Sequence, residues 1–269
     1  MTIRQAITKA QTNLQPSNDA RFDALLLAEH TFKLDKTQLH LQANMLVDPT
    51  HYFNLVARRA AGEPLQYILG SWEFYGLPFA VGLGVLIPRP ETEMLVELAL
   101  RNAQCMLNAE LTIVDLCAGS GCIGLSIAHH LPHAQVHLVE LSDAALPYLK
   151  QNAARYPNAT VHHDDIFNYA SSIAHCALVV SNPPYIATHE LASLQAEVQH
   201  EPAMALDGGA DGLDFYRKLA EIWLPRCDVL AVECGDGQAE DIVQLFGGGE
   251  ILQDFNGIGR VVVAKREQV

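Results

Sequence analysis

The sequence predicts an α/β fold, in which a seven-stranded, mostly parallel sheet ends in an antiparallel hairpin and a small helical bundle precedes it. Three observations support this. From residue 111 onward, apolar runs rich in β-branched residues alternate with segments of helical periodicity. The last two runs are separated only by a short region around Asn256-Gly257, which leaves no room for a crossover helix. Residues 1 to about 65 carry apolar residues at helical spacing.

The elements of the α/β region follow from this alternation. Strands are expected at residues 111–115, 135–139, 159–163, 176–180, 228–233, 249–254 and 260–264. Helices are expected at residues 121–130, 142–155, 212–224 and 237–246. Such an order is typical of a mostly parallel sheet with helices on both faces.

The N-terminal region is expected to form helices over Ile3–Ala10, Phe22–Phe32 and Leu46–Ala60. Ser17-Asn18-Asp19 is a candidate cap for the second helix, and Asp48-Pro49-Thr50 for the third. This region is interpreted as a partner-recognition or packing module, because no residue cluster in it suggests chemistry.

The chain is expected to divide into three parts. Residues 1–70 form the helical domain, residues 71–90 a β-hairpin linker, and residues 91–269 the main domain. The linker is predicted because Trp72 to Leu86 is rich in aromatic and β-branched residues, with glycines at likely turn positions.

The composition is that of an ordinary globular protein, with 269 residues of which 49% are hydrophobic and 18% charged. Met1 to Gln15 is polar, unlike a signal peptide, and no run of about 18 apolar residues occurs. The six cysteines show no paired CxxC spacing, so they are expected to be reduced thiols and not disulfides or zinc ligands. We therefore expect a cytoplasmic protein that does not bind membranes.

The net charge of -14 is unevenly distributed. Residues 1–70 carry seven Lys and Arg against six Asp and Glu, whereas residues 71–269 carry ten against twenty-five. Binding of a phosphate backbone depends on Lys and Arg that neutralise it. The acidic second part therefore argues against direct nucleic-acid binding.

Asp115 to Gly124 is predicted to be a strand end, a tight turn and a helix start. Gly119, Gly121 and Gly124 satisfy the G-x-G-x-x-G fingerprint of dinucleotide-binding proteins. Glycines let the backbone turn sharply and let a ligand approach closely. Alone, the fingerprint is weak, because a nicotinamide cofactor and S-adenosylmethionine both present an adenosine ribose.

Acidic residues at three predicted strand ends refine this choice. Glu140 is placed to accept hydrogen bonds from ribose hydroxyls. Asp115 suits a cofactor with a cationic amino group, since it would repel a pyrophosphate. Asp165 is placed to accept from an adenine amine while Ile166 packs on the ring. Each also has a structural interpretation: a turn cap for Asp115, a solvated strand end for Glu140 and a helix cap for Asp165.

A proline-rich turn, Asn182-Pro183-Pro184-Tyr185, follows the buried run from Ala177 to Val180. Each proline fixes φ and has no N–H to donate, so the turn is stiff and presents acceptors. These are the Asn182 side-chain oxygen and nearby backbone carbonyls, and Tyr185 adds a flat face. The set fits a planar NH2 group, either a carboxamide or an exocyclic base amine. The alternative is a simple loop, because Asn and Pro both favour turns.

These motifs together resemble known families. Asp115 to Gly124, Glu140 and the turn from Asn182 to Tyr185 are similar to class I (Rossmann-like) methyltransferases that methylate planar amine nitrogens. A narrower resemblance is to bacterial peptide chain release factor glutamine methyltransferases, and it rests on Gly62 to Ile68, Ile87 to Glu93, Glu201-Pro202, Ala205-Leu206 and Gly208 to Tyr216. Cys117-Ala118 departs from the Gly-Thr type of pair that is commoner there.

The resemblance implies a donor, a substrate and a set of site residues. The donor is S-adenosylmethionine, and the substrate is the glutamine of the Gly-Gly-Gln motif in release factors, methylated on its side-chain amide nitrogen (N5). The implied cofactor site is Asp115, Cys117, Ala118, Gly119, Ser120, Gly121, Glu140, Asp165, Ile166 and Asn182. The implied substrate contacts are Asn182, Pro183, Pro184 and Tyr185, of which Asn182, Pro183 and Tyr185 are catalytic. Residues 91–269 are then the methyltransferase domain and residues 1–70 the substrate-recognition domain.

The chemistry of an amide sets the mechanism we expect. An amide nitrogen is a poor nucleophile because its lone pair is delocalised into the carbonyl. Asn182 Oδ1 and the Pro183 carbonyl are expected to accept its two N–H bonds and stabilise the developing positive charge, with Tyr185 against the amide plane. The sulfonium leaves as a neutral thioether, so no acid is needed, and no strong base is obvious; the proton passes to water.

Other functions use parts of the same pattern. An adenine-N6 nucleic-acid methyltransferase would use the same turn but predicts a basic groove. A dinucleotide-dependent oxidoreductase would use the glycine loop but leaves Asn182 to Tyr185 unexplained, and a non-catalytic module would bind no cofactor. A metal site is not expected, because Pro132 breaks the helix between His129 and His133, which otherwise have ligand spacing.

Overall fold

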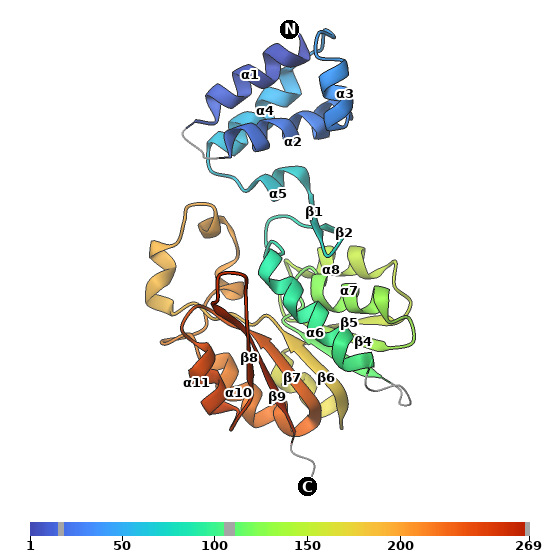
Figure 1. Cartoon of the computed structure of the whole chain (residues 1–269), viewed down its shortest axis with the longest axis vertical. Coiled ribbons are helices and arrows are strands. Elements are labelled where there is room, and N and C mark those ends of the chain that lie inside the picture. The colour runs from blue at the N-terminus through green and yellow to red at the C-terminus, as the bar shows by residue number, and fades with distance from the viewer. Residues whose placement is uncertain (16–18, 105–110, 267–269) are drawn as a thin grey trace. The chain divides into compact units, whose positions relative to one another are not determined.

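The structure is a computed structural model that describes residues 1–15, 19–104 and 111–266 (Figure 1). The chain forms two compact units. One comprises Met1–Ser71 and the short segment Ala196–His200, and the other comprises Trp72–Gln195 and the chain from Glu201 on. Three residues used in the sequence analysis, Ser17, Asn18 and Cys105, lie outside the described residues.

The first unit is helical. It contains α1 (Ile3–Asn13), α2 (Ala20–Phe32), α3 (Lys36–Leu41), α4 (Thr50–Ala60) and α5 (Leu65–Leu69). Capping boxes start α1 and α3, where the Thr2 and Asp35 side chains each accept a hydrogen bond from a backbone N–H three residues ahead. The sequence analysis did not predict α3 and α5, because helices this short contain too few turns to show a period.

Helix α4 begins at Thr50, later than the predicted start at Leu46. The Asp48 carboxylate accepts hydrogen bonds from the Thr50 N–H and hydroxyl, so the predicted start signal does stand at the beginning of the helix. Leu46 lies instead in an isolated bridge to Thr2 and is 76% exposed. The prediction was wrong at this end because the apolar Leu46 happens to fall at helical spacing from the apolar residues of α4.

A buried ion pair joins parts of this unit that are distant in sequence. Arg59 Nε donates to Asp23 Oδ2 at 2.6 Å, and Arg59 Nη2 donates to Glu197 Oε1 at 2.5 Å. The Arg59 and Asp23 side chains are 9% and 4% exposed, whereas Glu197 is 51% exposed. Burial raises the pKa of Asp23 although Arg59 opposes the shift. Through Glu197, the segment Ala196–His200 is attached to α4.

The second unit contains a seven-stranded sheet in the order β5-β4-β3-β6-β7-β9-β8. Its strands are β3 (Thr112–Leu116), β4 (Gln135–Glu140), β5 (Ala159–His163), β6 (Cys176–Ser181), β7 (Cys227–Glu233), β8 (Glu250–Gln253) and β9 (Gly259–Lys265). Strands β3 to β7 pair in parallel, and β9 is antiparallel to both β7 and β8. The predicted fold class, including the terminal antiparallel hairpin, is confirmed.

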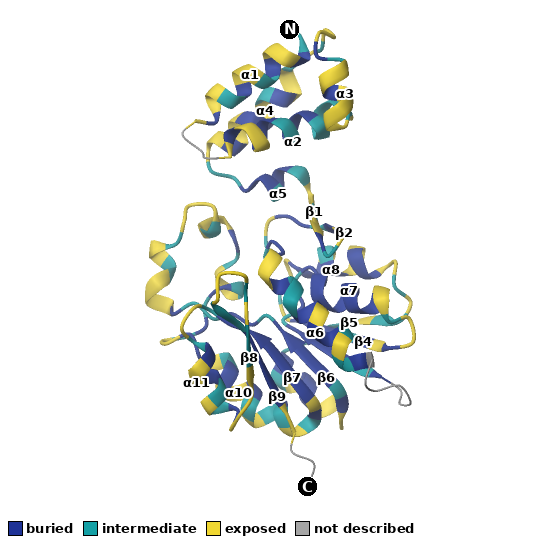
Figure 2. Ribbon diagram, viewed as in Figure 1, coloured by how far each residue is buried: buried dark blue, intermediate teal, exposed yellow. Residues whose placement is uncertain are grey.

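Helices cover both faces of this sheet, whose strands are largely buried (Figure 2). The helices are α6 (Glu93–Gln104), α7 (Cys122–His130), α8 (Leu146–Ala153), α9 (Ile166–Tyr169), α10 (Asp214–Ile222) and α11 (Ala239–Leu245). Successive residues of β3 enter different cores: Ile113 packs with residues of α6, α7 and α8, and Val114 with residues of α9, α10 and α11. A separate hairpin, β1 (Ser71–Phe74) and β2 (Leu77–Ala80), precedes the sheet and is shorter than predicted.

The strand order places a switch point between β3 and β6. From β3 the chain continues to β4 on one side, and from β6 it continues to β7 on the other side. Because β3 and β6 are neighbours, their connections run in opposite directions across the sheet. Ligands of open α/β sheets bind at the carboxyl ends of the strands near such a point. The glycine loop follows β3 and the Asn182 turn follows β6, so both lie at that edge.

Two features of the described residues bear on the composition. All five described cysteines are free of disulfides, and burial raises the thiol pKa of each of them.

In the part of the chain that the structure describes, no helix has the length and apolar character needed to cross a membrane.

The buried ion pair makes a stability prediction. Arg59→Met is expected to lower the free energy of unfolding by about 3 kcal/mol, because it leaves the Asp23 carboxylate buried without its partner. Glu197→Gln is the matched control, and it should cost less than about 1 kcal/mol because Glu197 is half exposed. Urea unfolding followed by helical circular dichroism measures both. The double variant Asp23→Asn, Arg59→Met should be more stable than Arg59→Met alone, and an equal loss would contradict the explanation.

Candidate active site

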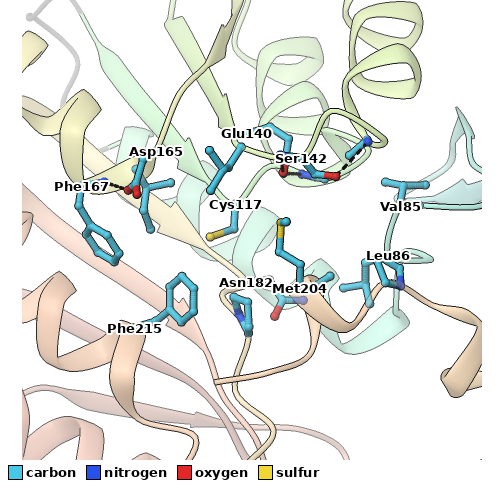
Figure 3. Close-up of a pocket in the computed structure, with 18 of the residues that line it drawn as sticks. Val85, Leu86, Cys117, Glu140, Ser142, Asp165, Phe167, Asn182, Met204 and Phe215 are labelled. Atoms are coloured by element: carbon cyan, nitrogen blue, oxygen red, sulfur yellow. Dashed lines mark hydrogen bonds between the residues drawn. The ribbon is translucent and has the colours of Figure 1, made fainter. Parts of the chain in front are cut away.

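A cavity of about 270 Å³ is lined by residues that follow the carboxyl ends of β3, β4, β5 and β6 (Figure 3). Its other walls come from residues 84–86, from Pro202, Met204 and Ala205, and from helix α10. The predicted cofactor or substrate residues that line it are Cys117, Gly119, Glu140, Asp165, Ile166, Asn182 and Pro184. The fold therefore brings together residues that the sequence analysis took from four separate motifs.

The remaining predicted residues are not among those that line this cavity: Asp115, Ala118, Ser120, Gly121, Pro183 and Tyr185. Asp115, Ala118 and Ser120 are buried. The Tyr185 ring lies near the end of β7, where a Cβ on Gly235 would be 3.3 Å from Tyr185 Cδ2. Their contacts with a cofactor or substrate stay predictions.

The glycine loop turns through left-handed backbone at Cys117 (φ 58°) and Gly119 (φ 56°). A Cβ on Gly119 would meet nothing nearer than Val85 Cγ2, at 3.8 Å, and Val85 lines the cavity. Gly119 therefore leaves open the space that a ligand would use. At Cys117 the left-handed conformation costs a residue with a Cβ about 1 kcal/mol, so the departure from glycine falls at a strained position.

Gly124 has a different role, in packing. A Cβ there would lie 2.3 Å from Leu138 Cδ2 and 2.8 Å from Asp115 Oδ2. No side chain fits in that space, so the glycine lets the start of α7 approach the sheet closely. The third glycine of the fingerprint thus serves the fold and not the ligand.

Asp115 is fully buried at the end of β3. Its Oδ2 accepts a hydrogen bond from the Gly124 N–H at 2.8 Å, whereas its Oδ1 is buried and has no hydrogen-bond partner among the described residues. Burial raises the pKa of Asp115 to about 7, and the nearby Glu140 adds to the rise. An orphaned acceptor beside the glycine loop would be satisfied by a cationic group of a ligand.

Glu140 joins the ends of two strands. Its Oε2 accepts from the Gly119 N–H and its Oε1 from the Ser142 N–H, each at 2.7 Å. The side chain is almost buried, yet it lines the cavity, and each carboxylate oxygen has a second lone pair. Glu140 is therefore a brace for the glycine loop that can still accept hydrogen bonds from a ligand.

Asp165 caps α9, as its structural interpretation predicted. Its Oδ1 accepts from the Phe167 N–H at 2.8 Å (Figure 3). Asp165 and Ile166 both line the cavity. Phe167 and Phe215 form an aromatic wall beside them, with ring centroids 6.0 Å apart. Capping fixes Asp165 at the cavity wall, and its second oxygen remains for a ligand.

The turn that begins at Asn182 is fixed from several sides. Asn182 Nδ2 donates to Thr92 Oγ1 at 3.3 Å, and the Tyr185 carbonyl accepts from Gln238 Nε2 at 2.9 Å. The segment that follows folds back along it, since the Ile186 N–H donates to the Leu206 carbonyl at 2.9 Å. The acceptors of this stiff turn are thereby held at the edge of the cavity.

Sequence reasoning missed the walls that come from residues 84–86, from the chain after Glu201 and from helix α10. Val85, Leu86, Met204 and Lys218 line the cavity without belonging to any motif, and Phe215, within the stretch Gly208 to Tyr216, had no predicted role there. Glu201 joins the first two of these segments, because it accepts from the Ile87 N–H at 3.0 Å and forms an ion pair with Arg89. The resemblance had marked Arg89 and Glu201, but neither local pattern shows that the two residues meet.

Within residues 1–15, 19–104 and 111–266, no group of three or more His, Cys, Asp or Glu side chains is arranged to hold a metal ion. The chemistry of this site is that of a partly apolar cavity with backbone donors, carboxylate acceptors and one amide.

The sequence matches two family models. One is described as the PrmC N-terminal domain and matches residues 5–70, and the other as the methyltransferase small domain and matches residues 92–209. A solved structure, the hMettl16 catalytic domain in complex with the MAT2A 3'UTR hairpin 6, superposes with a TM-score of 0.55 over 79% of this chain and 82% of that one. At 15% identity, this likeness shows the fold alone.

Curated relatives match along nearly the whole chain. The release factor glutamine methyltransferase of Thermodesulfovibrio yellowstonii is 36% identical over 99% of this chain and 97% of its own length. That of Geobacter sulfurreducens is 41% identical over 97% and 95%. These identities over nearly the whole length show that the chain belongs to the release factor glutamine methyltransferase family.

Proposed function

We propose that this protein methylates the side-chain amide nitrogen (N5) of the glutamine in the Gly-Gly-Gln motif of peptide chain release factors, in the cytoplasm, with S-adenosylmethionine as donor. One observation supports this most directly. Asn182 lines the same cavity as Gly119 and Glu140, so an acceptor for a planar NH2 group lies beside the predicted cofactor residues. The relatives at 36% and 41% identity carry the corresponding name.

The residues of the cavity fit S-adenosylmethionine. Gly119 leaves space for a ligand, and Glu140 and Asp165 can accept from hydroxyl and amine donors. Behind the glycine loop, outside the cavity lining, Asp115 Oδ1 is a buried acceptor without a partner among the described residues. We assign Asp115 to the cationic amino group, Glu140 to the ribose and Asp165 with Ile166 to the adenine. When bound, this cofactor supplies an electrophilic methyl group.

The Asn182 turn binds and orients the substrate amide. Because Asn182 Nδ2 donates to Thr92, the other end of the side chain, Oδ1, is the one that can face a substrate. Asn182 Oδ1 and the Pro183 carbonyl accept the two N–H bonds of the glutamine and so stabilise positive charge on the nitrogen during transfer. Tyr185 contributes by holding the turn through its carbonyl, which accepts from Gln238.

The adenine-N6 reading uses the same acceptors and is the alternative that an experiment must separate. The acidic second part of the chain, with ten Lys and Arg against twenty-five Asp and Glu, disfavours a nucleic-acid backbone as ligand. The residues assigned to the cofactor would be the same in either reaction, so only the substrate distinguishes them.

Asn182→Ala is expected to lower kcat about 100-fold or more, by analogy with loss of one donor from an oxyanion hole. The assay mixes labelled S-adenosylmethionine with unmethylated release factor, with its Gly-Gly-Gln variant carrying Gln→Ala, and with DNA. Label should enter only the unaltered release factor. Label on DNA alone would replace the proposal with the adenine reading, and full activity of Asn182→Ala would remove Asn182 from the mechanism.

Gly119→Ala is expected to weaken S-adenosylmethionine binding at least about 10-fold, because the added Cβ stands in the cavity. Gly257→Ala is the matched control: Gly257 also has a positive φ, of 79°, and a Cβ there has nothing within 4 Å. Both variants carry similar backbone strain, so titration calorimetry isolates the effect of the cavity. Equal affinities for the two variants would show that the cofactor binds elsewhere.

A further inference from the structure

Glu233 is a buried acid that the mechanism above does not use. It ends β7, the strand that pairs with β6, and it is 3% exposed. Its carboxyl group makes a hydrogen bond with the Thr92 side chain, and Oε2 is buried without a hydrogen-bond partner among the described residues. A half-satisfied carboxyl group in a protein interior is costly, so its presence calls for a function.

Thr92 connects Glu233 to the substrate site. It closes the short 3-10 turn Pro90–Thr92 before α6, and it is 2% exposed. The same hydroxyl that bonds Glu233 accepts the hydrogen bond from Asn182 Nδ2. Glu233, Thr92 and Asn182 therefore form one hydrogen-bonded row that ends at the cavity.

The direction of the hydrogen bonds in this row follows from the number of protons. A threonine hydroxyl has a single proton to donate. An ionised Glu233 can only accept, so Thr92 donates to it and has only lone pairs left for Asn182. Asn182 must then turn Nδ2 toward Thr92, which leaves Oδ1 for the substrate, since the ends of an amide are chosen by the hydrogen bonds they make.

We propose that Glu233 and Thr92 are positioning residues for the methyl transfer: ionised Glu233 commits the Thr92 proton, and Thr92 in turn holds Asn182 with Oδ1 facing the substrate amide. The inference rests on the proposed function, because it assigns a purpose to the orientation of Asn182. A protonated Glu233 reverses the row. It donates to Thr92, Thr92 donates to Asn182 Oδ1, and Nδ2 then faces the N–H bonds of the substrate.

The surroundings of Glu233 set where this reversal occurs. Burial raises the pKa of Glu233 to about 7, Glu91 adds to the rise, and Arg260 and Arg89 oppose it. The other titratable groups that face Glu233 from neighbouring elements are Tyr185, Tyr216, Cys234 and Cys122. Burial or nearby charge raises the pKa of each of these four, so they stay neutral near pH 7. Glu233 is thus the group of this set that titrates there.

The sign of the pH effect follows. Above about pH 7 Glu233 is ionised and Asn182 presents its acceptor, so kcat is at its full value. With S-adenosylmethionine saturating, so that its cationic amino group keeps Asp115 ionised, kcat should fall with the protonation of one group, Glu233, as the pH falls through about 7. In Glu233→Gln this step should disappear from the profile of kcat against pH, because the amide does not titrate. The range to measure is about pH 6 to 8, about one unit on either side of the pKa.

Thr92→Val removes the hydroxyl and keeps the shape of the side chain. It should lower kcat about 10-fold with the KM for S-adenosylmethionine unchanged within about threefold, because one orienting hydrogen bond is lost and Thr92 does not line the cavity. Thr92→Ser should restore kcat to within about twofold of the unaltered protein. Adding Glu233→Gln to Thr92→Val should lower kcat no further, since Glu233 acts through Thr92. Ser126→Ala, at a fully buried hydroxyl away from this row, controls for loss of packing.

The side-chain amide of Asn182 gives a readout that needs no substrate. Its ¹⁵N–¹H signals, assigned by their absence in Asn182→Ala, should shift with a midpoint near pH 7 in the unaltered protein and should not do so in Thr92→Val. If the Asn182 signals titrate in this way but the release factor is not methylated, the hydrogen-bonded row is supported and the proposed function is contradicted. Methylation with no titration, and with kcat of Thr92→Val within about twofold of the unaltered protein, would overturn the inference and leave the function standing.

Discussion

The parallel register of β3 with its two neighbours is the constraint on which the site depends. Leu116 pairs with Val139 of β4 and with Ser181 of β6, so the next residues of all three strands emerge at one edge. The glycine loop lies between Glu140 and Asn182 for this reason alone. A shift of one residue in either pairing would move each side chain to the opposite face of the sheet and would separate these groups.

Three carboxyl groups at this edge differ because their surroundings differ. The Glu140 carboxylate accepts hydrogen bonds from two backbone N–H groups, and the Asp115 carboxylate accepts one. Among the described residues, no backbone N–H donates to the Glu233 carboxylate. Burial is the largest cause of the raised pKa of both Asp115 and Glu233. Carboxyl groups that are short of donors are destabilised as anions, and such groups are suited to respond to a ligand or to pH.

Much of the fold could be predicted from local pattern, and less of the site. The run at residues 176–180 predicted β6 to within one residue, because a central strand is apolar on both faces. α5 was missed because five residues are too few to show a period. At the site, the ends of parallel strands were predictable from topology, whereas Met204 and Phe215 were not. Met204 lies in a segment that the Arg89–Glu201 ion pair, between residues 112 positions apart, joins to the chain around Arg89. Phe215 reaches the cavity from α10, which packs on the sheet.

The helical unit is assembled from two separate stretches of chain, and this has a consequence for synthesis. Helices α1 to α5 are complete once Ser71 has been made, but Glu197, the exposed partner of Arg59, lies more than a hundred residues further on. At ribosomal speeds of about 5–20 residues per second, roughly 10 s pass before that residue emerges. The nascent bundle therefore holds Arg59 with Asp23 alone through this interval, and its final form waits until most of the sheet has been translated.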